Sequence, residues 1–410
     1  MIKRFAKFLS LLILAVFAFS VCTYAIEDGE YRYGEENNFV IYVSDGKVEI
    51  AIANSTLTGN CVIPSEIYGC PVTSIRTLAF WGSSYETITV PDTVTHIGDS
   101  AFEAANTKRI FLPDRIETMG DRVFALCDEL VEVRLPENFN VIGEAMFDGC
   151  TVLEKIDIPT SVTQIKANAF ASCRSLVEIE LPENLESIGD SAFYGCNKLV
   201  SVEIPKSVIS IGARTFSYCE GLKEVVVNSP ISVVAGECFY YCPVHEKVKI
   251  DAKCIGSYAF YRCYELKTVY FSKNVQTIER NAFFDSPVQN VYYTGTKDEW
   301  NKISIADGND ILKNVKNIIF VYTETEIKKQ NGFYHVKVSA FGDVSGCSVL
   351  FSCYENESMK HMGFAENING GSVYNGCIPE SILFDTVKIF VWNMGSLSPV
   401  SQVEMIDVEE

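Results

Sequence analysis

Apolar and polar positions repeat through the middle of the chain with a period of about 23 residues. Phenylalanine shows the period most fully, at Phe80, Phe102, Phe124, Phe147, Phe170, Phe193, Phe216, Phe239, Phe260 and Phe283. Proline keeps the same period from Pro91 to Pro205, and cysteine joins it from Cys127 to Cys263. Self-similarity at a fixed spacing of about 20–50 residues is typical of stacked repeat proteins. The pattern therefore predicts a solenoid whose successive repeats share one apolar interior.

Each repeat predicts the same short elements. In one copy, Leu176 is followed by aliphatic residues at alternating positions, which predicts a strand with one buried face. Pro182 ends this strand because proline cannot donate to the ladder. Gly189 in the Ile-Gly step predicts a sharp bend where glycine tolerates backbone angles that other residues avoid. Phe193 then turns inward and fills the interior of the coil.

The repeat pattern LxxIxLPxxVxxIGxxAFxxCxxL resembles the BspA-like leucine-rich repeat family of bacterial surface proteins. Residues 62–75 look like the usual first repeat of that family, and the resemblance covers about residues 30–320. It implies a right-handed leucine-rich repeat coil with a parallel β-sheet and about ten 23-residue repeats. It also implies adhesion or binding roles with varied ligands, and it does not single out one ligand.

Two places depart from the period. Residues 228–230 replace the usual Leu-Pro step, and the step from Phe239 to Phe260 is 21 residues long. A local bulge or bend is the expected cause, and an insertion specific to a ligand is the alternative.

A hairpin is predicted ahead of the repeats. Residues 39–52 alternate between apolar and polar, with Asp45 and Gly46 at the expected turn. We expect this hairpin to cap the N-terminal end of the array.

A short helix is predicted behind the repeats. Thr296 and Glu299 fit a capping box, and Trp300 and Ile303 would then pack on the last coil. An exposed Trp300 could instead bind a sugar, but packing within the cap is the favoured interpretation.

The period stops near residue 322. Residues 333–341, 347–354, 387–392 and 403–408 alternate like strands and predict a small β-sandwich. The full division is a signal peptide (1–25), an N-terminal β cap (26–61), repeats (62–294), a C-terminal cap (295–321) and a sandwich-like domain (322–410).

The N-terminus has the three parts of a secretory signal peptide. Positive charges begin it, an apolar run spans residues 8–21, and Ala25 suits cleavage. Fourteen apolar residues are too few for a membrane anchor, which needs about 20. Cys22 leaves a lipid anchor as an alternative. We expect a secreted or cell-surface protein with no transmembrane span after cleavage; its anchoring mechanism stays open.

Charge excludes some partners. The net charge is −19, and removal of three cations with the signal peptide makes it −22. Nucleic acid and anionic membranes require a positive surface, so neither is an expected partner.

Seven of the fifteen cysteines recur once per repeat. Side chains stacked in a column point the same way and do not converge as a disulfide requires, so buried free thiols are expected. Cys347, Cys353 and Cys377 near the C-terminus leave one bridge possible. Zinc is not expected because no CxxC pair occurs.

No catalytic constellation emerges from the residues. The histidines His96, His245, His335 and His361 are far apart, the first two on predicted repeat turns, and no nucleophile, metal-helix or phosphate-loop motif occurs. Neighbouring acids such as Glu178 and Glu180 should be solvated equally, which does not separate an acid from a base. We therefore expect no enzyme, no catalytic residue, no metal and no cofactor.

The outward side of the strands is the expected binding surface. Side chains alternate along a strand, so residues four and two before each proline should point away from the interior. Arginine and aromatic residues on such a face are typical of binding hot spots. The candidate contacts on this concave face are Arg109, Phe111, Arg134, Lys155, Asp157, Glu178, Glu180, Glu203, Glu224, Tyr270 and Tyr292.

These expectations favour a monomeric, non-catalytic recognition or adhesion protein that binds a host or bacterial protein. One alternative is a carbohydrate-binding surface protein in which Tyr270 and Tyr292 stack on sugar rings. Others are a structural spacer of the cell envelope and an enzyme whose site is not recognisable from sequence.

Overall fold

The computed structural model describes most of the chain from residue 29 onward. The predicted signal peptide, residues 1–25, lies outside the described residues. Contacts divide the chain into an N-terminal unit, Met1–Leu199 with Thr215–Gly221, and a C-terminal unit, Val200–Arg214 with Leu222–Glu410. Each unit is described by itself. The described ranges are 29–34, 38–244, 247–315, 317–320, 322–330, 333–341, 347–355, 358–368, 373–379, 386–393 and 398–407.

The N-terminal unit begins with the predicted hairpin. β2 (Phe39–Ser44) and β3 (Lys47–Ala53) pair antiparallel. Asp45 and Gly46 have φ angles of 50° and 67°, the positive values that a two-residue hairpin turn needs. β3 then pairs in parallel with β6 (Cys70–Ile75), so the hairpin supplies the first edge on which coils stack.

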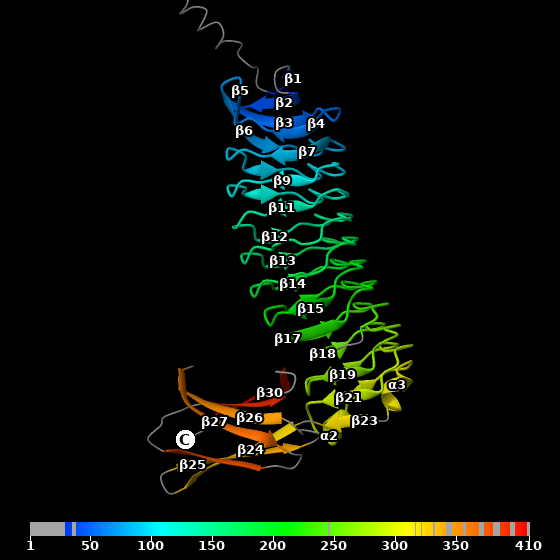
Figure 1. Ribbon diagram of the computed structural model, residues 1–410, viewed down its shortest axis with the longest axis vertical. Coiled ribbons are helices and arrows are strands. Elements are labelled where there is room, and N and C mark those ends of the chain that lie inside the picture. Colours follow the sequence, from blue (N-terminus) through cyan, green and yellow to red (C-terminus); the bar gives the residue numbers. More distant parts are fainter. Residues whose placement is uncertain are drawn as a thin grey trace, which may run out of the picture. The chain divides into compact units, whose positions relative to one another are not determined.

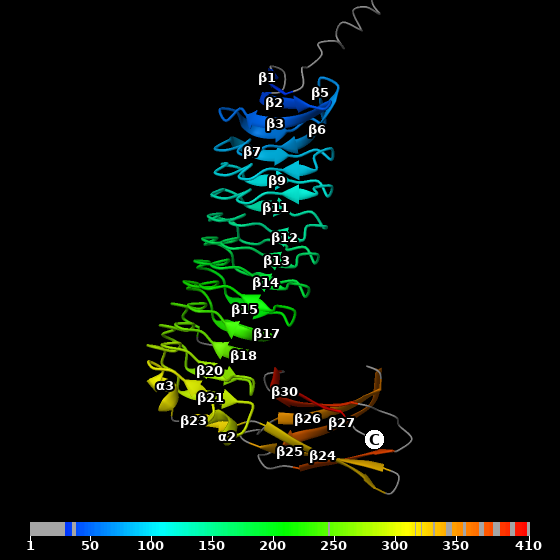
Figure 2. The same ribbon diagram turned by 180° about the vertical axis from the view of Figure 1, so that it is seen from behind.

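Coils of the N-terminal unit form two rows of short parallel strands (Figure 1). Figure 2 shows the same rows from behind. One row lies before the prolines and the other beside the Ile-Gly bends. The first row is β4 (Thr58–Val62), β7 (Ser84–Thr89), β9 (Arg109–Phe111) and β11 (Glu132–Arg134). The second contains β6, β8 (His96–Ile97), β10 (Thr118–Met119), β12 (Val141–Ile142), β13 (Gln164–Ile165) and β14 (Ser187–Ile188). Short β1 (Glu30–Gly34) and β5 (Glu66–Ile67) pair antiparallel with β2 and β6.

Two copies lack the predicted strand before proline. The segments 154–158 and 177–181 run as irregular backbone, so the predicted strand from Leu176 is wrong. One backbone bond, from Val177 N to Glu154 O at 3.1 Å, still links the two coils. Leu176 and Ile179 remain buried, so side-chain packing keeps the position where the ladder is incomplete.

The C-terminal unit continues the same design. Its long strands pair in parallel and in sequence order. The register shifts between Val227 and Ile231 where β17 pairs with β18, which confirms the predicted bulge near residues 228–230. The long strands are β15 (Ser201–Ile204), β17 (Glu224–Val234), β18 (Lys247–Ile255), β19 (Thr268–Phe271), β21 (Asn290–Tyr293) and β23 (Asn317–Phe320). The short strands are β16 (Ser210–Ile211), β20 (Thr277–Ile278) and β22 (Ser304–Ile305).

Seven antiparallel strands follow the array, in sheets ordered β24-β25-β28 and β27-β26-β29-β30. The four strands expected from alternation are confirmed as β25 (Phe333–Phe341), β26 (Cys347–Glu355), β29 (Thr386–Asn393) and β30 (Ser398–Asp407). Sequence reasoning missed three polar or glycine- and proline-containing strands, β24 (Tyr322–Gln330), β27 (Ser358–Ile368) and β28 (Val373–Pro379). The sandwich packing and the segment boundaries stay predictions.

A column of phenylalanine rings fills the interior, as predicted. In the N-terminal unit, Phe147, Phe170 and Phe193 are fully buried, and successive rings lie 5.2 Å apart at interplanar angles of 4° and 8°. In the C-terminal unit, the ring centroid of Phe260 lies 5.0 Å from that of Phe239 and 5.1 Å from that of Phe283. Each ring therefore packs mainly on its equivalents in the neighbouring coils.

The turns around these rings contain residues whose backbone dihedral angles lie in the left-handed region. Asn168 and Ser172, two positions before and after Phe170, have φ angles of 56° and 58°. Such angles cost about 1–2 kcal/mol for a residue with a Cβ. They direct the N–H groups of Asn168, Phe170 and Ser172 to carbonyl oxygens of the next coil, at 2.9, 2.7 and 2.7 Å. The resulting hydrogen bonds offset the strain.

The glycine at the bend allows the backbones of two neighbouring coils to approach closely. Gly189 does not have a positive φ, so the prediction that it is needed for unusual backbone angles is wrong. A Cβ there would lie 2.5 Å from Ala167 N and 2.6 Å from Lys166 C of the preceding coil. Gly98 and Gly120 meet the preceding coil in the same way. Glycine is required because the two backbones leave no room for a side chain.

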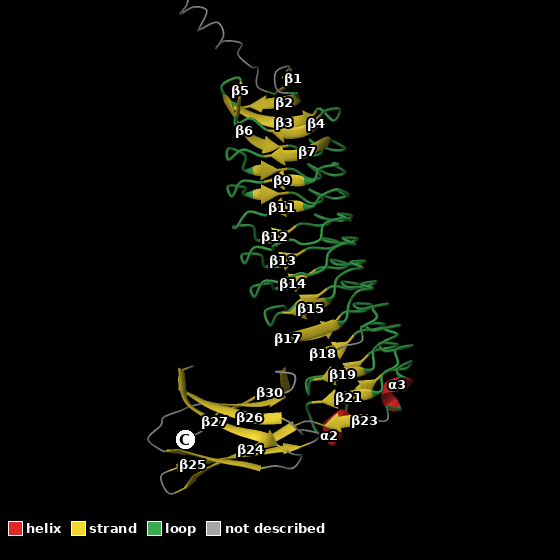
Figure 3. Ribbon diagram, viewed as in Figure 1, coloured by secondary structure: helices red, strands yellow, loops and turns green. Residues whose placement is uncertain are grey.

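The array ends in two short helices, the only helices among the described residues (Figure 3). α2 (Lys297–Trp300) has the predicted capping box between Thr296 and Glu299. Trp300 is buried and contacts the rings of Phe271 and Tyr293, which confirms that it packs within the cap.

A buried asparagine completes this end. Asn309, just before α3 (Asp310–Lys313), accepts a hydrogen bond on Oδ1 from Phe283 N at 3.0 Å. Its Nδ2 donates to Glu279 O at 2.7 Å and to Ala306 O at 3.0 Å. In earlier coils the N–H of the column phenylalanine donates to a carbonyl oxygen of the next coil. The side-chain oxygen of Asn309 replaces that carbonyl oxygen for Phe283, the last phenylalanine of the column.

Replacing a column ring should destabilise the array strongly. Phe170→Ala should lower the free energy of unfolding by about 3–5 kcal/mol, because it leaves a cavity between two stacked rings. Val177→Ala, at a side chain that is 41% exposed, should change it by less than about 0.5 kcal/mol. Urea unfolding of both variants measures the difference, and similar losses would contradict the shared interior.

Two glycines of one coil should respond differently to alanine. Gly189→Ala forces two backbones apart and should cost about 3 kcal/mol or more, at the upper end for overpacking. Gly195 has a φ of 70°, but a Cβ there would meet only Ser172 Cα at 4.0 Å. Gly195→Ala should therefore cost only about 1 kcal/mol, the strain of a left-handed residue. Urea unfolding compares them, and the reverse order would refute the close-approach explanation.

Candidate binding surface

The outward strand face is formed by residues in exact register between coils. Arg109 is paired with Glu132, and Phe111 with Arg134, across β9 and β11. The residues between them are buried, whereas Phe111 is 43% exposed. The predicted direction of these side chains is therefore confirmed by the geometry.

The C-terminal unit repeats this arrangement. Ser201 is paired with Glu224, and Glu203 with Val226, across β15 and β17. Tyr270 is paired with Tyr292 across β19 and β21. The structure thus groups Glu203 with Glu224, and Tyr270 with Tyr292, on faces built by successive strands.

The remaining candidates lie on the irregular copies of the N-terminal unit. Lys155, Asp157, Glu178 and Glu180 are all exposed. Lys155 Nζ lies 3.7 Å from Asp157 Oδ1 and 3.5 Å from Glu178 Oε1. These carboxylates, Asp157 foremost, raise the pKa of Lys155.

Basic side chains on this face are largely compensated. Arg134 Nη2 lies 3.2 Å from Asp114 Oδ1 and 3.2 Å from Glu137 Oε1. Exposed pairs of this kind contribute little to stability and weaken with salt. The basic and acidic residues of this face therefore form charge pairs between and within coils, with acids in excess.

The tyrosine pair on the strand face stacks on itself. The rings of Tyr270 and Tyr292 lie 4.6 Å apart at 13°. Lys249 precedes Tyr270 in register, and Ile319 follows Tyr292. Burial raises the pKa of Tyr270. The ring faces are thus turned toward neighbours in the ladder.

Sequence reasoning missed a second group of aromatics, on the turn side of the C-terminal unit. Its members, with one arginine, are Tyr240, Tyr241, Tyr258, Tyr261, Arg262, Tyr264 and Phe284; we call this group the tyrosine cluster. Five of them follow the column phenylalanines by one or two positions. The recurrence of aromatic residues at these positions in successive repeats is the sequence signal that identifies them.

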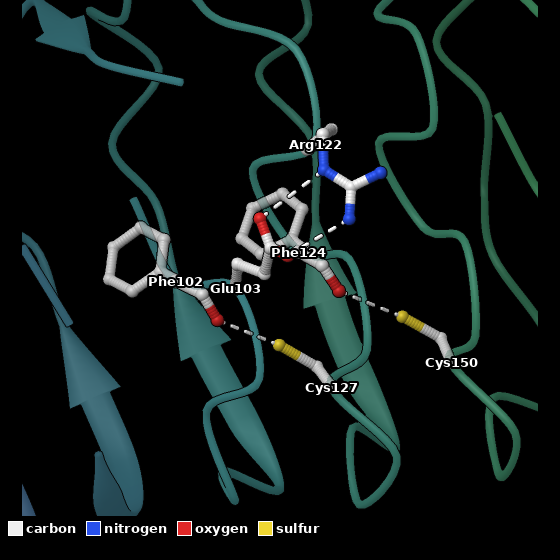
Figure 4. A network of polar contacts seen from close by, with 6 residues as sticks. All are labelled: Phe102, Glu103, Arg122, Phe124, Cys127 and Cys150. Atoms are coloured by element: carbon white, nitrogen blue, oxygen red, sulfur yellow. Dashed lines mark hydrogen bonds and ion pairs between the residues drawn. The ribbon is translucent and has the colours of Figure 1, made fainter. Parts of the chain in front are cut away.

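The column cysteines are buried as predicted, and six of the seven thiols donate to a carbonyl oxygen of the preceding coil, as Figure 4 shows for two of them. Cys127 Sγ donates to Phe102 O at 3.0 Å, and Cys150 Sγ donates to Phe124 O at 3.2 Å. Ser286 takes this position in a later coil and donates from Oγ to Phe260 O at 2.6 Å. In these coils the position thus holds a small side chain with a hydrogen-bond donor, whereas Ala105 takes it without a donor in an early coil.

Burial suppresses the chemistry of these thiols. It raises the pKa of Cys127 and of Cys196 to about 12. It raises the pKa of Cys150 and Cys173 well above the ordinary value. The thiolate is the reactive form, so these side chains are poor nucleophiles and metal ligands.

One ion pair in the same region joins two neighbouring coils. Arg122 binds Glu103 through Nη2 at 2.9 Å and through Nε at 3.3 Å (Figure 4). The hydrogen bond from Arg122 lowers the pKa of Glu103. This ion pair helps to hold the two neighbouring coils together.

Within the described residues, no group of three or more histidine, cysteine or acidic side chains is placed to hold a metal. His96 lies in β8, where the sequence predicted a turn, because its neighbour Ile97 enters the core and the pair joins the second ladder. His245 lies outside the described residues. No described helix has the length and apolarity needed to cross a membrane.

A solenoid of stacked leucine-rich coils with exposed ladders defines a repeat scaffold of the leucine-rich class. The family model for the BspA type leucine-rich repeat region matches in six copies, over residues 73–200 and 186–311. These ranges span more than half of the chain, so the protein belongs to the BspA-type leucine-rich repeat family. This confirms the resemblance and the repeat fold expected from sequence. No curated protein matches the chain.

Several solved structures are similar. A leucine-rich repeat protein from Bacteroides ovatus is 23% identical, with a TM-score of 0.42 over 72% of this chain and 90% of that chain. A leucine-rich cell surface protein from Faecalibacterium prausnitzii is 21% identical, with a TM-score of 0.37 over 68% and 99%. The pneumococcal vaccine antigen PcpA is 16% identical, with a TM-score of 0.39 over 72% and 99%.

The buried thiols should make stability depend on alkaline pH. The pKa of Cys196 is about 12 in the folded chain and about 8.5 in the unfolded chain. Above pH 8.5 the thiol therefore ionises only in the unfolded chain, so the contribution of Cys196 to folding stability is complete below pH 8.5 and is lost as the pH rises toward 12. Each such thiol should lower the free energy of unfolding by about 1.4 kcal/mol per pH unit in that window.

Cys196→Ser keeps a donor without this titration. Urea unfolding between pH 8 and 10.5 under reducing conditions should show a shallower fall for this variant, by about 1.4 kcal/mol per pH unit. Parallel profiles for variant and native chain would show that Cys196 titrates normally.

Proposed function

We propose that this protein is an exported, non-catalytic recognition or adhesion protein that binds a host or bacterial protein along its outward strand face. Membership of the BspA-type family supports the class of function. The positively charged start, the apolar run of residues 8–21 and Ala25 support export to the medium or the cell surface. We also propose that it acts as a monomer.

The observation that carries the proposal is the register of the exposed side chains. Parallel pairing places Arg109 beside Glu132, and Phe111 beside Arg134, so that one surface collects a residue from each coil. Such a surface is long and ordered, and it can hold many weak contacts to a protein partner. Arginine and aromatic residues on it have the composition of binding hot spots.

Sugar binding through the strand face is less well supported. Carbohydrate rings stack on open aromatic faces, but Tyr270 and Tyr292 stack on one another at 4.6 Å. The flanking ladder residues, Lys249 and Ile319, occupy the positions on either side. The pair therefore favours contact through ring edges and hydroxyl groups, which suits a protein surface.

Absence of catalysis is part of the same proposal. The buried thiols have raised pKa values, and the exposed acids Glu178 and Glu180 lie on open surface. Neither environment produces the pair of unequal groups that acid–base catalysis needs.

The test uses the mature chain on two arrays, one of purified host-matrix and bacterial surface proteins and one of glycans. We expect protein binding that the double substitution Phe111→Ala and Arg134→Ala weakens at least about tenfold, because a hot-spot contact is lost. Binding should also weaken between 50 and 500 mM salt, since exposed charge pairs are screened.

Ile209→Ala is the matched control, because Ile209 is 72% exposed and lies off the strand face. It should leave the dissociation constant unchanged within about twofold. Binding to glycans alone would instead support the carbohydrate alternative, and binding to neither array would support a structural spacer.

A further inference from the structure

The tyrosine cluster lies in the C-terminal unit, on the turns around the column phenylalanines Phe239, Phe260 and Phe283. Tyr261 is at its centre, with its ring 5.1 Å from Tyr240 at 7° and 5.5 Å from Phe284 at 11°. The ring centroids of Tyr258 and Tyr241 lie 5.5 Å and 6.2 Å from that of Tyr261. Successive turns therefore build one continuous aromatic surface.

The fold does not require aromatics at these positions. The interior beside them is already filled by the buried rings of the column. In the N-terminal unit, the position directly after the column phenylalanine is aromatic at Trp81 and Tyr194, but it is small or acidic at Glu103, Ala125, Asp148, Ala171 and Ser217. Tyr264 is nevertheless 51% exposed, and Phe284 is 45% exposed. Exposed aromatics that packing does not need are typical of an interaction surface.

The cluster is electrically balanced. Arg262 Cζ lies 5.3 Å from the ring centroids of both Tyr241 and Tyr261. Its Nε lies 3.3 Å from Asp285 Oδ2, and its Nη1 donates to the Tyr241 hydroxyl. The one cation of the cluster is thus compensated by a carboxylate in a chain whose net charge is −19. A partner of opposite charge is not needed here.

The stacking also decides which atoms a partner can reach. Tyr240, Tyr261 and Phe284 cover one another's faces, so their edges and hydroxyl groups are directed outward. Ring edges carry partial positive charge, and phenol hydroxyls donate hydrogen bonds. Sugar rings prefer open aromatic faces, whereas carbonyl groups of a protein backbone match edges and hydroxyls.

We propose that the tyrosine cluster is a second protein-binding surface, separate from the strand face, for an uncharged protein segment that presents backbone carbonyl acceptors. Tyrosine and arginine supply large contact area at low entropic cost, as they do in antibody paratopes. This surface does not depend on the strand-face proposal, since its residues and its chemistry are different.

The experiment pans a random linear peptide library on the mature, full-length chain and measures dissociation constants of the selected synthetic peptides. We expect peptides poor in charged residues, with affinities that change less than twofold between 50 and 500 mM salt. The double substitution Tyr264→Ala and Phe284→Ala should weaken their binding at least tenfold. Tyr264→Phe, which keeps the ring and removes the hydroxyl, should give a smaller loss.

Two control variants separate this surface from others. Trp81→Ala removes an aromatic that is 60% exposed at the equivalent turn position of an early coil, and it should change affinity less than twofold. Phe111→Ala on the strand face should do the same. Circular dichroism and urea unfolding confirm that each variant is folded.

Four results would overturn the proposal: no selected peptide, selection of charged and salt-sensitive peptides alone, equal loss with Trp81→Ala, or no loss with the double substitution. Specific glycan binding that the double substitution abolishes would also overturn it, because the cluster would then be a sugar site. Loss of strand-face binding alone leaves this proposal intact, and loss at the cluster alone leaves the strand-face proposal intact.

Discussion

Stacking of one coil on the next is the constraint on which the rest of the structure depends. Each coil must bring its hydrogen-bonding groups and its apolar side chains to the same height as those of its neighbours. Phe147, Phe170 and Phe193 meet this condition by packing ring on ring at 5.2 Å. The cysteine thiols meet it by donating to the backbone of the preceding coil. A repeat cannot satisfy these contacts alone, so stability depends on neighbours.

The same constraint separates structural positions from those open to function. Interior columns need one residue type because their partners are copies of themselves. Exposed positions need only avoid like-charge contact, so they can differ from coil to coil. The strand face carries paired charges such as Lys155 with Glu178, and the turns of the C-terminal unit carry the tyrosine cluster. One scaffold thereby carries two surfaces of different chemistry.

Both ends of the array satisfy groups that a missing neighbour would leave unbonded. The hairpin of β2 and β3 gives the first coil an edge to pair with. Near the other end, Asn309 accepts from Phe283 N in place of another coil, while Trp300 covers apolar rings. These caps depart from the repeat pattern because they have stacking partners on only one side.

The amino-acid sequence by itself determined the coil, the phenylalanine column, the hairpin turn at Asp45, the capping box at Thr296 and the outward direction of Arg109 and Phe111. These depend on residues close together in sequence, or on identical residues in successive coils, so a single sequence contains the information.

Only the tertiary structure decided how closely the coils approach. It showed that Gly189 is needed for contact between two backbones and that the segment 177–181 lacks a regular strand. It also brought Tyr240, Tyr261 and Phe284 into one stack. These outcomes depend on distances between atoms some 20 residues or more apart in sequence. Such distances are set by how the backbones of neighbouring coils pack, and no pattern within a single repeat specifies them.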